Sequence, residues 1–193
     1  MNIEELLARS TWVDEYEQRW VNEDIEGVDL FRALRVMRKH LPTAQSYLET
    51  RGEKFPWAKT WLKYGRTFPT PTKKLCQLMF DRGLMLEKGH CHFNALVMSN
   101  DMRSWTDEIS QTTRYVEGIA VCPMGAHPHS WVVVGGRVLD PTWTCAYMTT
   151  YYGVSFEPDR VQSVAKANGF RGITSHWDKC GELVIEHLES RSA

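Results

Sequence analysis

Two neighbouring stretches of the chain read Arg114-Tyr-Val-Glu-Gly-Ile-Ala-Val-Cys122 and His129-Ser-Trp-Val-Val-Val-Gly-Gly-Arg-Val-Leu-Asp140. Both are rich in β-branched and aromatic residues, which favour extended strands. The second contains the pair Gly135-Gly136, which is typical of a tight hairpin turn. The sequence therefore predicts a strand over 114–122 followed by an antiparallel hairpin over 129–140.

The position of the turn also predicts which side chains share a face. If the turn is centred on the Gly-Gly pair, Trp131 lies opposite Asp140. His129, two residues earlier, is then a diagonal neighbour of Asp140 on the same face, with Cα atoms about 7–8 Å apart. A shift of one residue in the register would place His129 and Asp140 on opposite faces. We expect the two side chains to meet.

Helical patterns flank the predicted strands on both sides, because apolar residues recur three or four positions apart. The expected helices cover residues 1–52, 73–79, 91–99, 157–168 and 176–189. The sequence thus predicts an α+β fold, with helices packed on a small antiparallel sheet. An N-terminal helical section (1–70) and an α+β core (71–193) are expected to form one compact domain.

Composition narrows the class of protein. Hydrophobic residues make up 42% of the 193 residues, and eight of the aromatic residues are Trp, which indicates an ordered globular protein. A net charge of −1 provides no overall field that favours nucleic acid or an anionic membrane. Acidic residues occupy the N-terminus where a secretory signal would be basic, and no apolar run approaches about 18 residues. We expect a soluble, cytoplasmic protein.

The cysteines are five in number and widely scattered, without a Cys-x-x-Cys pair. This pattern argues against a disulfide framework and against a zinc ribbon. The chain also lacks a Gly-x-Gly-x-x-Gly motif and a phosphate-binding loop, so no nucleotide or other cofactor is expected.

One cysteine differs from the others in its context. Cys91 is at the predicted start of a helix, where the helix dipole favours a thiolate and backbone N–H groups can receive a developing oxyanion. With His129 and Asp140 it supplies a nucleophile, a base and an orienting carboxylate.

Five short motifs carry a resemblance to a known family. They are Cys-His-Phe-Asn-Ala (91–95), Tyr-Val-Glu-Gly (115–118), His-Ser-Trp (129–131), Asp-Pro-Thr-Trp (140–143) and Tyr-Tyr-Gly-Val-Ser-Phe (151–156). In order and spacing they resemble the papain-like/transglutaminase-like cysteine-enzyme superfamily, and more narrowly a poorly characterised bacterial and phage branch of it. In that superfamily a cysteine at a helix start precedes a histidine and an aspartate on neighbouring antiparallel strands.

The resemblance implies acyl transfer through a thioester. Cys91 would be the nucleophile, His129 the general base and acid, and Asp140 the group that orients His129. The substrate would be a peptide, amide or ester, possibly a protein, and the thioester would pass to water or to an amine.

Several further residues are candidates for the oxyanion donor or the substrate pocket. Gln77 is the side-chain donor that would join the Cys91 backbone N–H. Glu117 either pairs with polar groups near the sheet or lines the pocket. The other candidates are His92, Asn94 and Trp131, although Asn94, one helical turn from Cys91, also suits a structural role.

Two other classes of function fit parts of the sequence. Zinc would accept the side-chain types in the cluster His90, Cys91, His92 and in Cys122, His127, His129, but their spacing matches no standard zinc motif. A catalytically inactive binding module on the same fold is the other alternative. Because the spacing of these His and Cys residues fits no zinc motif, we expect no metal in the thiol site itself.

Overall fold

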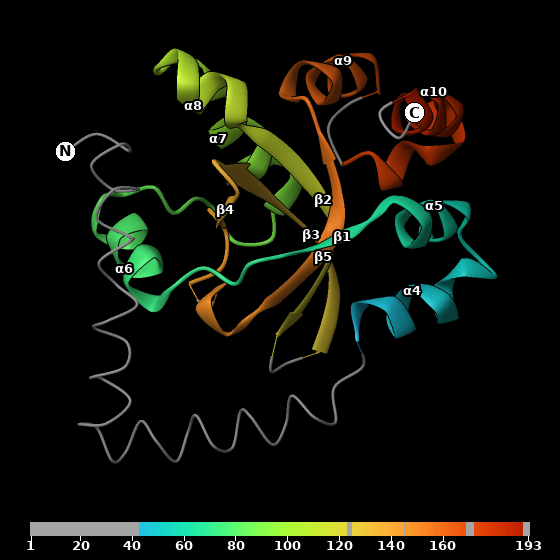
Figure 1. Cartoon of the computed structure of the whole chain (residues 1–193), viewed down its shortest axis with the longest axis horizontal. Coiled ribbons are helices and arrows are strands. Elements are labelled where there is room, and N and C mark those ends of the chain that lie inside the picture. Colours follow the sequence, from blue (N-terminus) through green and yellow to red (C-terminus); the bar gives the residue numbers. More distant parts are fainter. Residues whose placement is uncertain (1–42, 123–124, 145, 169–171, 191–193) are drawn as a thin grey trace.

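The computed structural model describes residues 43–122, 125–144, 146–168 and 172–190. These residues form seven α-helices and an antiparallel sheet of five strands (Figure 1). The α+β class predicted from the sequence is confirmed. The helical pattern expected over 1–42 lies outside the described residues.

The sheet has the strand order β1-β5-β2-β3-β4, and all neighbouring strands pair antiparallel. The strands are β1 (Arg66–Phe68), β2 (Arg114–Cys122), β3 (Gly125–Val134), β4 (Arg137–Leu139) and β5 (Thr150–Phe156). β2 matches its predicted range, and β3 begins before the predicted hairpin does.

The short strand β1 lies in a section for which only helices and a loop were predicted. Its three residues are too few to give an alternating pattern, and Phe68 pairs with Tyr151, which is distant in sequence. Pairing with β5 and burial of the Phe68 side chain select the extended conformation. The described part of the 1–70 section therefore contributes to the same sheet as the rest of the chain.

The register predicted for the β3–β4 hairpin is confirmed. Val134 pairs with Arg137, and Val132 pairs with Leu139. Gly135 and Gly136 have φ values of 55° and 81°, in the left-handed region that a two-residue hairpin turn of this kind requires at both positions. The turn therefore places Asp140, the residue after β4, beside Trp131.

The helices cover both faces of the sheet. They are α4 (Ala44–Gly52), α5 (Pro56–Tyr64), α6 (Lys73–Asp81), α7 (Cys91–Arg103), α8 (Asp107–Thr112), α9 (Pro158–Asn168) and α10 (Trp177–Ser190), with 3-10 turns η1 (Ala146–Met148) and η2 (Thr174–His176). In Figure 1, α4, α5, α9 and α10 are grouped on one side of the sheet and α6 is on the other.

Two apolar clusters form on the two faces. The larger contains Ile119 and Val132 together with residues of α4, α5, α7, α9 and α10. The smaller contains Val116 and Trp131 with Cys76 of α6 and Ala146 of η1. Because β2 is buried from Tyr115 and β3 from His129, a polar side chain buried there costs free energy unless it is hydrogen-bonded.

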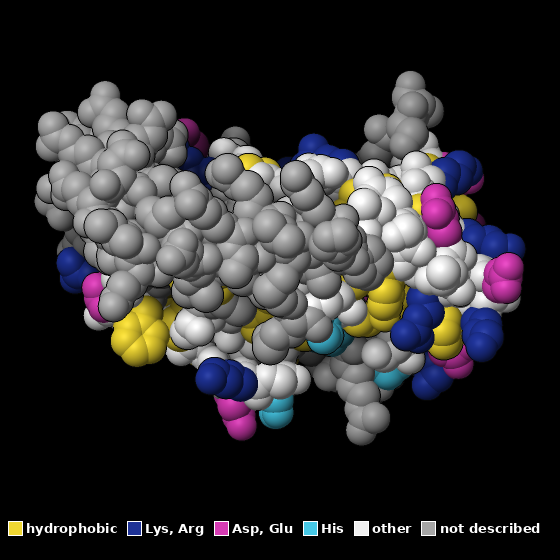
Figure 2. All heavy atoms as spheres, turned by 90° about the horizontal axis from the view of Figure 1, so that it is seen from below, with side chains coloured by type: hydrophobic (Ala, Val, Ile, Leu, Met, Phe, Trp, Pro, Cys, Tyr) yellow, Lys and Arg dark blue, Asp and Glu magenta, His cyan; other side chains and the backbone are white. Residues whose placement is uncertain are grey.

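The outer surface has two further features that bear on function. None of the helices that the structure describes combines the length and the apolar character that a bilayer crossing requires. On the face shown in Figure 2, the described Lys and Arg side chains are interspersed with Asp and Glu instead of forming one patch of a single sign.

Candidate active site

Cys91 is the first residue of α7, as predicted. The preceding residue, His90, does not cap the helix with its side chain, so the first-turn N–H groups depend on other partners. The buried Asn94 amide donates to the Glu87 carbonyl at 2.6 Å and to Thr142 Oγ1 at 3.1 Å. Asn94 thereby ties the start of α7 to the loop before it and to the segment after Asp140.

His129 and Asp140 meet on the face that the hairpin register assigns to them. His129 Nε2 lies 2.7 Å from Asp140 Oδ2, and both side chains are buried. The carboxylate also accepts hydrogen bonds from the Thr142 and Trp143 N–H groups and from the Tyr151 hydroxyl, at 2.9–3.1 Å. These contacts hold Asp140 in one orientation.

The second imidazole nitrogen of His129 is available to the Cys91 thiol. Since Nε2 of His129 is bonded to Asp140, Nδ1 is the nitrogen available for the hydrogen bond between His129 and Cys91. The Ser130 backbone also hydrogen-bonds to the Cys91 sulfur. Cys91 is partly exposed, whereas His129 is buried.

The charges in this group reinforce one another. Burial acts to lower the pKa of His129, but the charge and hydrogen bond of Asp140, with a smaller effect of Cys91, raise it to about 9. Burial acts to raise the pKa of Cys91, but the His129 hydrogen bond and the charges of His92 and His129 bring it below its usual value. The arrangement favours a thiolate beside an imidazolium.

Two indole rings enclose the His129 imidazole. Trp143 stacks on it with ring centroids 4.1 Å apart and an interplanar angle of 24°, and Trp131 lies near-parallel to it at 6.3 Å. Apolar rings near the His129–Asp140 hydrogen bond limit the access of water and strengthen the electrostatic interaction.

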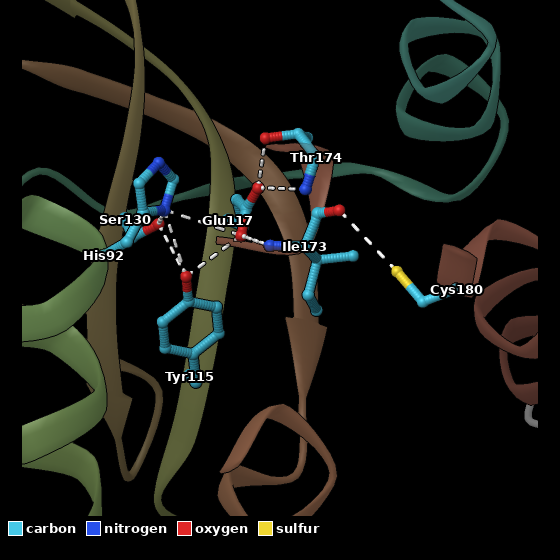
Figure 3. Close-up of polar contacts among 7 residues, drawn as sticks. All are labelled: His92, Tyr115, Glu117, Ser130, Ile173, Thr174 and Cys180. Carbon is cyan, nitrogen blue, oxygen red and sulfur yellow. Dashed lines mark hydrogen bonds and ion pairs between the residues drawn. The ribbon is translucent and has the colours of Figure 1, made fainter. Parts of the chain in front are cut away.

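A second polar cluster lies on the opposite face of β3 and centres on Glu117 (Figure 3). The buried Glu117 carboxylate accepts bonds from the Ile173 and Thr174 N–H groups, both at 2.8 Å, and from the Thr174 hydroxyl at 2.5 Å. The Tyr115 hydroxyl donates to it at 2.9 Å. Burial acts to raise the pKa of Glu117, but the charge of His92 and these hydrogen bonds lower it to about 2.

The remaining candidates fall into separate groups. Gln77 is exposed on α6, and its amide donates to Asp81 at 2.8 Å, so the structure does not direct it to Cys91. Trp131 is fully buried and supports His129 instead of lining an open pocket. Glu117 is likewise buried and bonded, which selects the first of its two predicted roles, and Asn94 is structural.

Sequence reasoning missed the residues that support the predicted groups. They are Tyr115, Ser130, Thr142, Trp143, Tyr151 and Thr174. Alternation along the strands was a usable signal for Tyr115, which shares a face with Glu117. Thr174 had none, because it approaches Glu117 only through the folding of the C-terminal section.

The other histidines near Cys91 have different surroundings. His90 is exposed and lies 3.9 Å from Glu87, and His127 packs edge-on against Trp143. Within residues 43–122, 125–144, 146–168 and 172–190, no three His, Cys, Asp or Glu side chains are grouped so that they could hold a metal ion.

Comparison with known proteins identified no relative of this chain. No protein-family model matches the chain, and searches of curated proteins and of solved structures found no similar protein.

Proposed function

We propose that the protein is a thiol-dependent acyl hydrolase or acyltransferase with a papain/transglutaminase-like core. The observation that carries this proposal is the 2.7 Å hydrogen bond between the buried Asp140 and His129, whose imidazole also interacts with the partly exposed residue Cys91. A buried carboxylate that orients an imidazole beside a thiol is the arrangement that activates a cysteine nucleophile.

In the proposed reaction the Cys91 thiolate attacks a carbonyl carbon and forms a C–S bond. The electron pair of the carbonyl moves to oxygen, where the Cys91 backbone N–H at the start of α7 is placed to donate a hydrogen bond. When the tetrahedral intermediate collapses, the bond to the leaving group breaks and His129 supplies the proton. The product is a thioester.

The second half of the reaction regenerates the thiolate. Water or an amine attacks the thioester carbonyl and gives its proton to His129, and the C–S bond breaks with its electrons returning to sulfur. The net result is hydrolysis or acyl transfer. The substrate class is a peptide, amide or ester, and it reaches the site at the exposed side of Cys91.

An activated aryl ester tests the proposal. Purified protein mixed with 4-nitrophenyl acetate should release a burst of nitrophenolate close to one equivalent, and the acetyl group should be found by mass spectrometry on the Cys91 peptide. Cys91→Ala should abolish both signals. Cys180→Ser is the matched control, because Cys180 is a buried thiol with a pKa raised by burial.

The outcome separates the two classes of function. Acetylation spread equally over the cysteines, or no burst, would contradict the enzyme and favour a binding module. If acetyl-Cys91 forms, adding hydroxylamine or a primary amine distinguishes the second half-reactions, since a transferase should pass the acetyl group to the amine faster than to water.

A further inference from the structure

Two consecutive residues of α7 contact two consecutive residues of β3. Cys91 interacts with the His129 side chain, while His92 Nδ1 lies 2.6 Å from Ser130 Oγ. Because successive side chains of a strand point to opposite faces, the His129 and Ser130 contacts lie on the two sides of the sheet. The charges of both imidazoles, His92 and His129, act to lower the pKa of Cys91.

The protons of the second cluster can be assigned from its distances. Glu117 is an anion and only accepts, so the single Tyr115 proton is the one donated to Glu117 Oε2 at 2.9 Å. Tyr115 oxygen can then accept from Ser130 Oγ, 2.9 Å away, or from His92 Nδ1, 3.2 Å away. A proton on His92 Nδ1 can also be donated to Ser130 Oγ at 2.6 Å.

This assignment leaves the other nitrogen of His92 outside the cluster. In Figure 3 the second ring nitrogen points away from Glu117, Tyr115 and Ser130. The His92 side chain retains 21% exposure, and its Nδ1 is 3.5 Å from Glu117 Oε2. With a proton on Nε2 as well, His92 is an imidazolium. Its negative partner, Glu117, lies on the Nδ1 side of the ring.

We propose that His92 is a second cation of the site, which stabilises the Cys91 thiolate independently of His129, and that Glu117 is the positioning residue that keeps His92 in place and charged. This inference rests on the proposed thiol chemistry. His92 and His129 have different roles, because His129 exchanges its proton in each half-reaction, whereas Nδ1 of His92 lies within the buried cluster of Glu117, at 2.6 Å from Ser130 and 3.5 Å from Glu117.

The consequence concerns the step in which the thioester breaks down. His129 is neutral in the thioester and becomes an imidazolium when it takes a proton from water or an amine, so it is positively charged when the negative charge returns to sulfur. A charged His92 adds a second positive group to the site at this step. A positive charge near a thiol favours its ionisation, and the charge of His92 acts on Cys91 in this direction.

The charged groups that face His92 come from three elements. Burial acts to lower the pKa of His92, but Glu117 on β2 and the Cys91 thiolate on α7 raise it above its usual value, against a smaller opposing effect of His129 on β3. Tyr115 keeps its proton because burial and Glu117 raise its pKa well above 10. The attractive groups outweigh the repulsive one.

Alkylation by iodoacetamide tests the inference without any acyl substrate. The rate at the Cys91 peptide is measured by mass spectrometry against pH on the full chain, for wild type, His92→Gln and His90→Gln. His90 flanks Cys91 on the other side and is exposed, so it is the matched control. His92→Gln should slow alkylation about tenfold near pH 6, the effect of removing an adjacent opposite charge.

Ser130→Ala provides a second test should His92→Gln fail to fold, because it removes the hydrogen-bond partner nearest to His92 Nδ1, at 2.6 Å. It should shift the pH profile in the same direction. Unchanged profiles in His92→Gln or in a folded Ser130→Ala, each compared with His90→Gln, would overturn the inference. Failure of the proposed function would be seen separately, as normal alkylation of wild type without formation of acetyl-Cys91.

Discussion

His129 and Ser130 are consecutive residues of β3 whose side chains bind partners on opposite faces of the sheet. His129 Nε2 lies 2.7 Å from Asp140 Oδ2, and Ser130 Oγ lies 2.6 Å from His92 Nδ1. The Ser130 backbone also contacts the Cys91 sulfur. Two consecutive residues of one strand therefore interact with His92 and Cys91.

Replacing Asp140 by Asn should reduce acyl-enzyme formation on the order of 10²–10⁴-fold, the contribution of an oriented general acid–base group. The amide removes the charge that holds the pKa of His129 near 9. The burst with 4-nitrophenyl acetate measures the loss. Asp81→Asn, at an exposed carboxylate that pairs with Gln77, should leave the burst unchanged.

The free energy of unfolding should depend on pH at both ends of the range. The His129 pKa is raised from 6.5 to about 9, so its stabilising contribution is complete below pH 6.5 and is lost as pH rises through about 9. The Glu117 pKa is lowered from 4.5 to about 2, so its contribution is complete above pH 4.5 and is lost as pH falls towards 2. These two groups together stabilise the protein most between pH 4.5 and 6.5.

Urea denaturation at a series of pH values checks this dependence. Asp140→Asn should weaken the loss of stability at alkaline pH, and Glu117→Gln should weaken the loss at acid pH. A wild-type curve that is flat over both ranges would contradict the assigned charges.

Gly172→Ala should disturb the site through His92. Gly172 has φ +88°, and an added Cβ would lie 2.5 Å from His92 Nδ1. We expect slower alkylation of Cys91, as in His92→Gln. Gly83→Ala is the matched control, because Gly83 also has a positive φ, at 66°, but nothing lies within 4 Å of the added carbon. Both variants should lose about 1–2 kcal/mol from backbone strain, and equal alkylation rates would refute the steric argument.

Asn94→Ala and Gln77→Ala should have different effects. Asn94 is buried and bonded to Glu87 and Thr142, so its removal should cost about 1–3 kcal/mol of stability and slow acetylation of Cys91. Gln77→Ala should change neither the unfolding midpoint nor the burst. A slower burst in Gln77→Ala would support the prediction that Gln77 is an oxyanion donor.

Local patterns in the sequence were sufficient to predict the hairpin and the pairing of His129 with Asp140. The Gly135-Gly136 turn sets the register, and alternation along a strand then assigns each side chain to a face. The start of α7 at Cys91 was equally predictable from the run of residues without Gly or Pro that follows it. These features depend on residues close together in the chain.

Only the tertiary structure decided what surrounds those groups. Thr174 hydrogen-bonds to Glu117, which lies 57 positions earlier in the sequence. The short strand β1 is stabilised by pairing with β5, where Phe68 pairs with Tyr151. Gln77 suited an oxyanion donor by residue type, yet it faces away on α6. Periodicity specifies the face on which a side chain lies, whereas contacts between distant segments depend on how helices pack over both faces of the sheet. The His129–Asp140 pair and the position of Cys91 could therefore be predicted from sequence, and the second histidine–carboxylate group could be seen only in the fold.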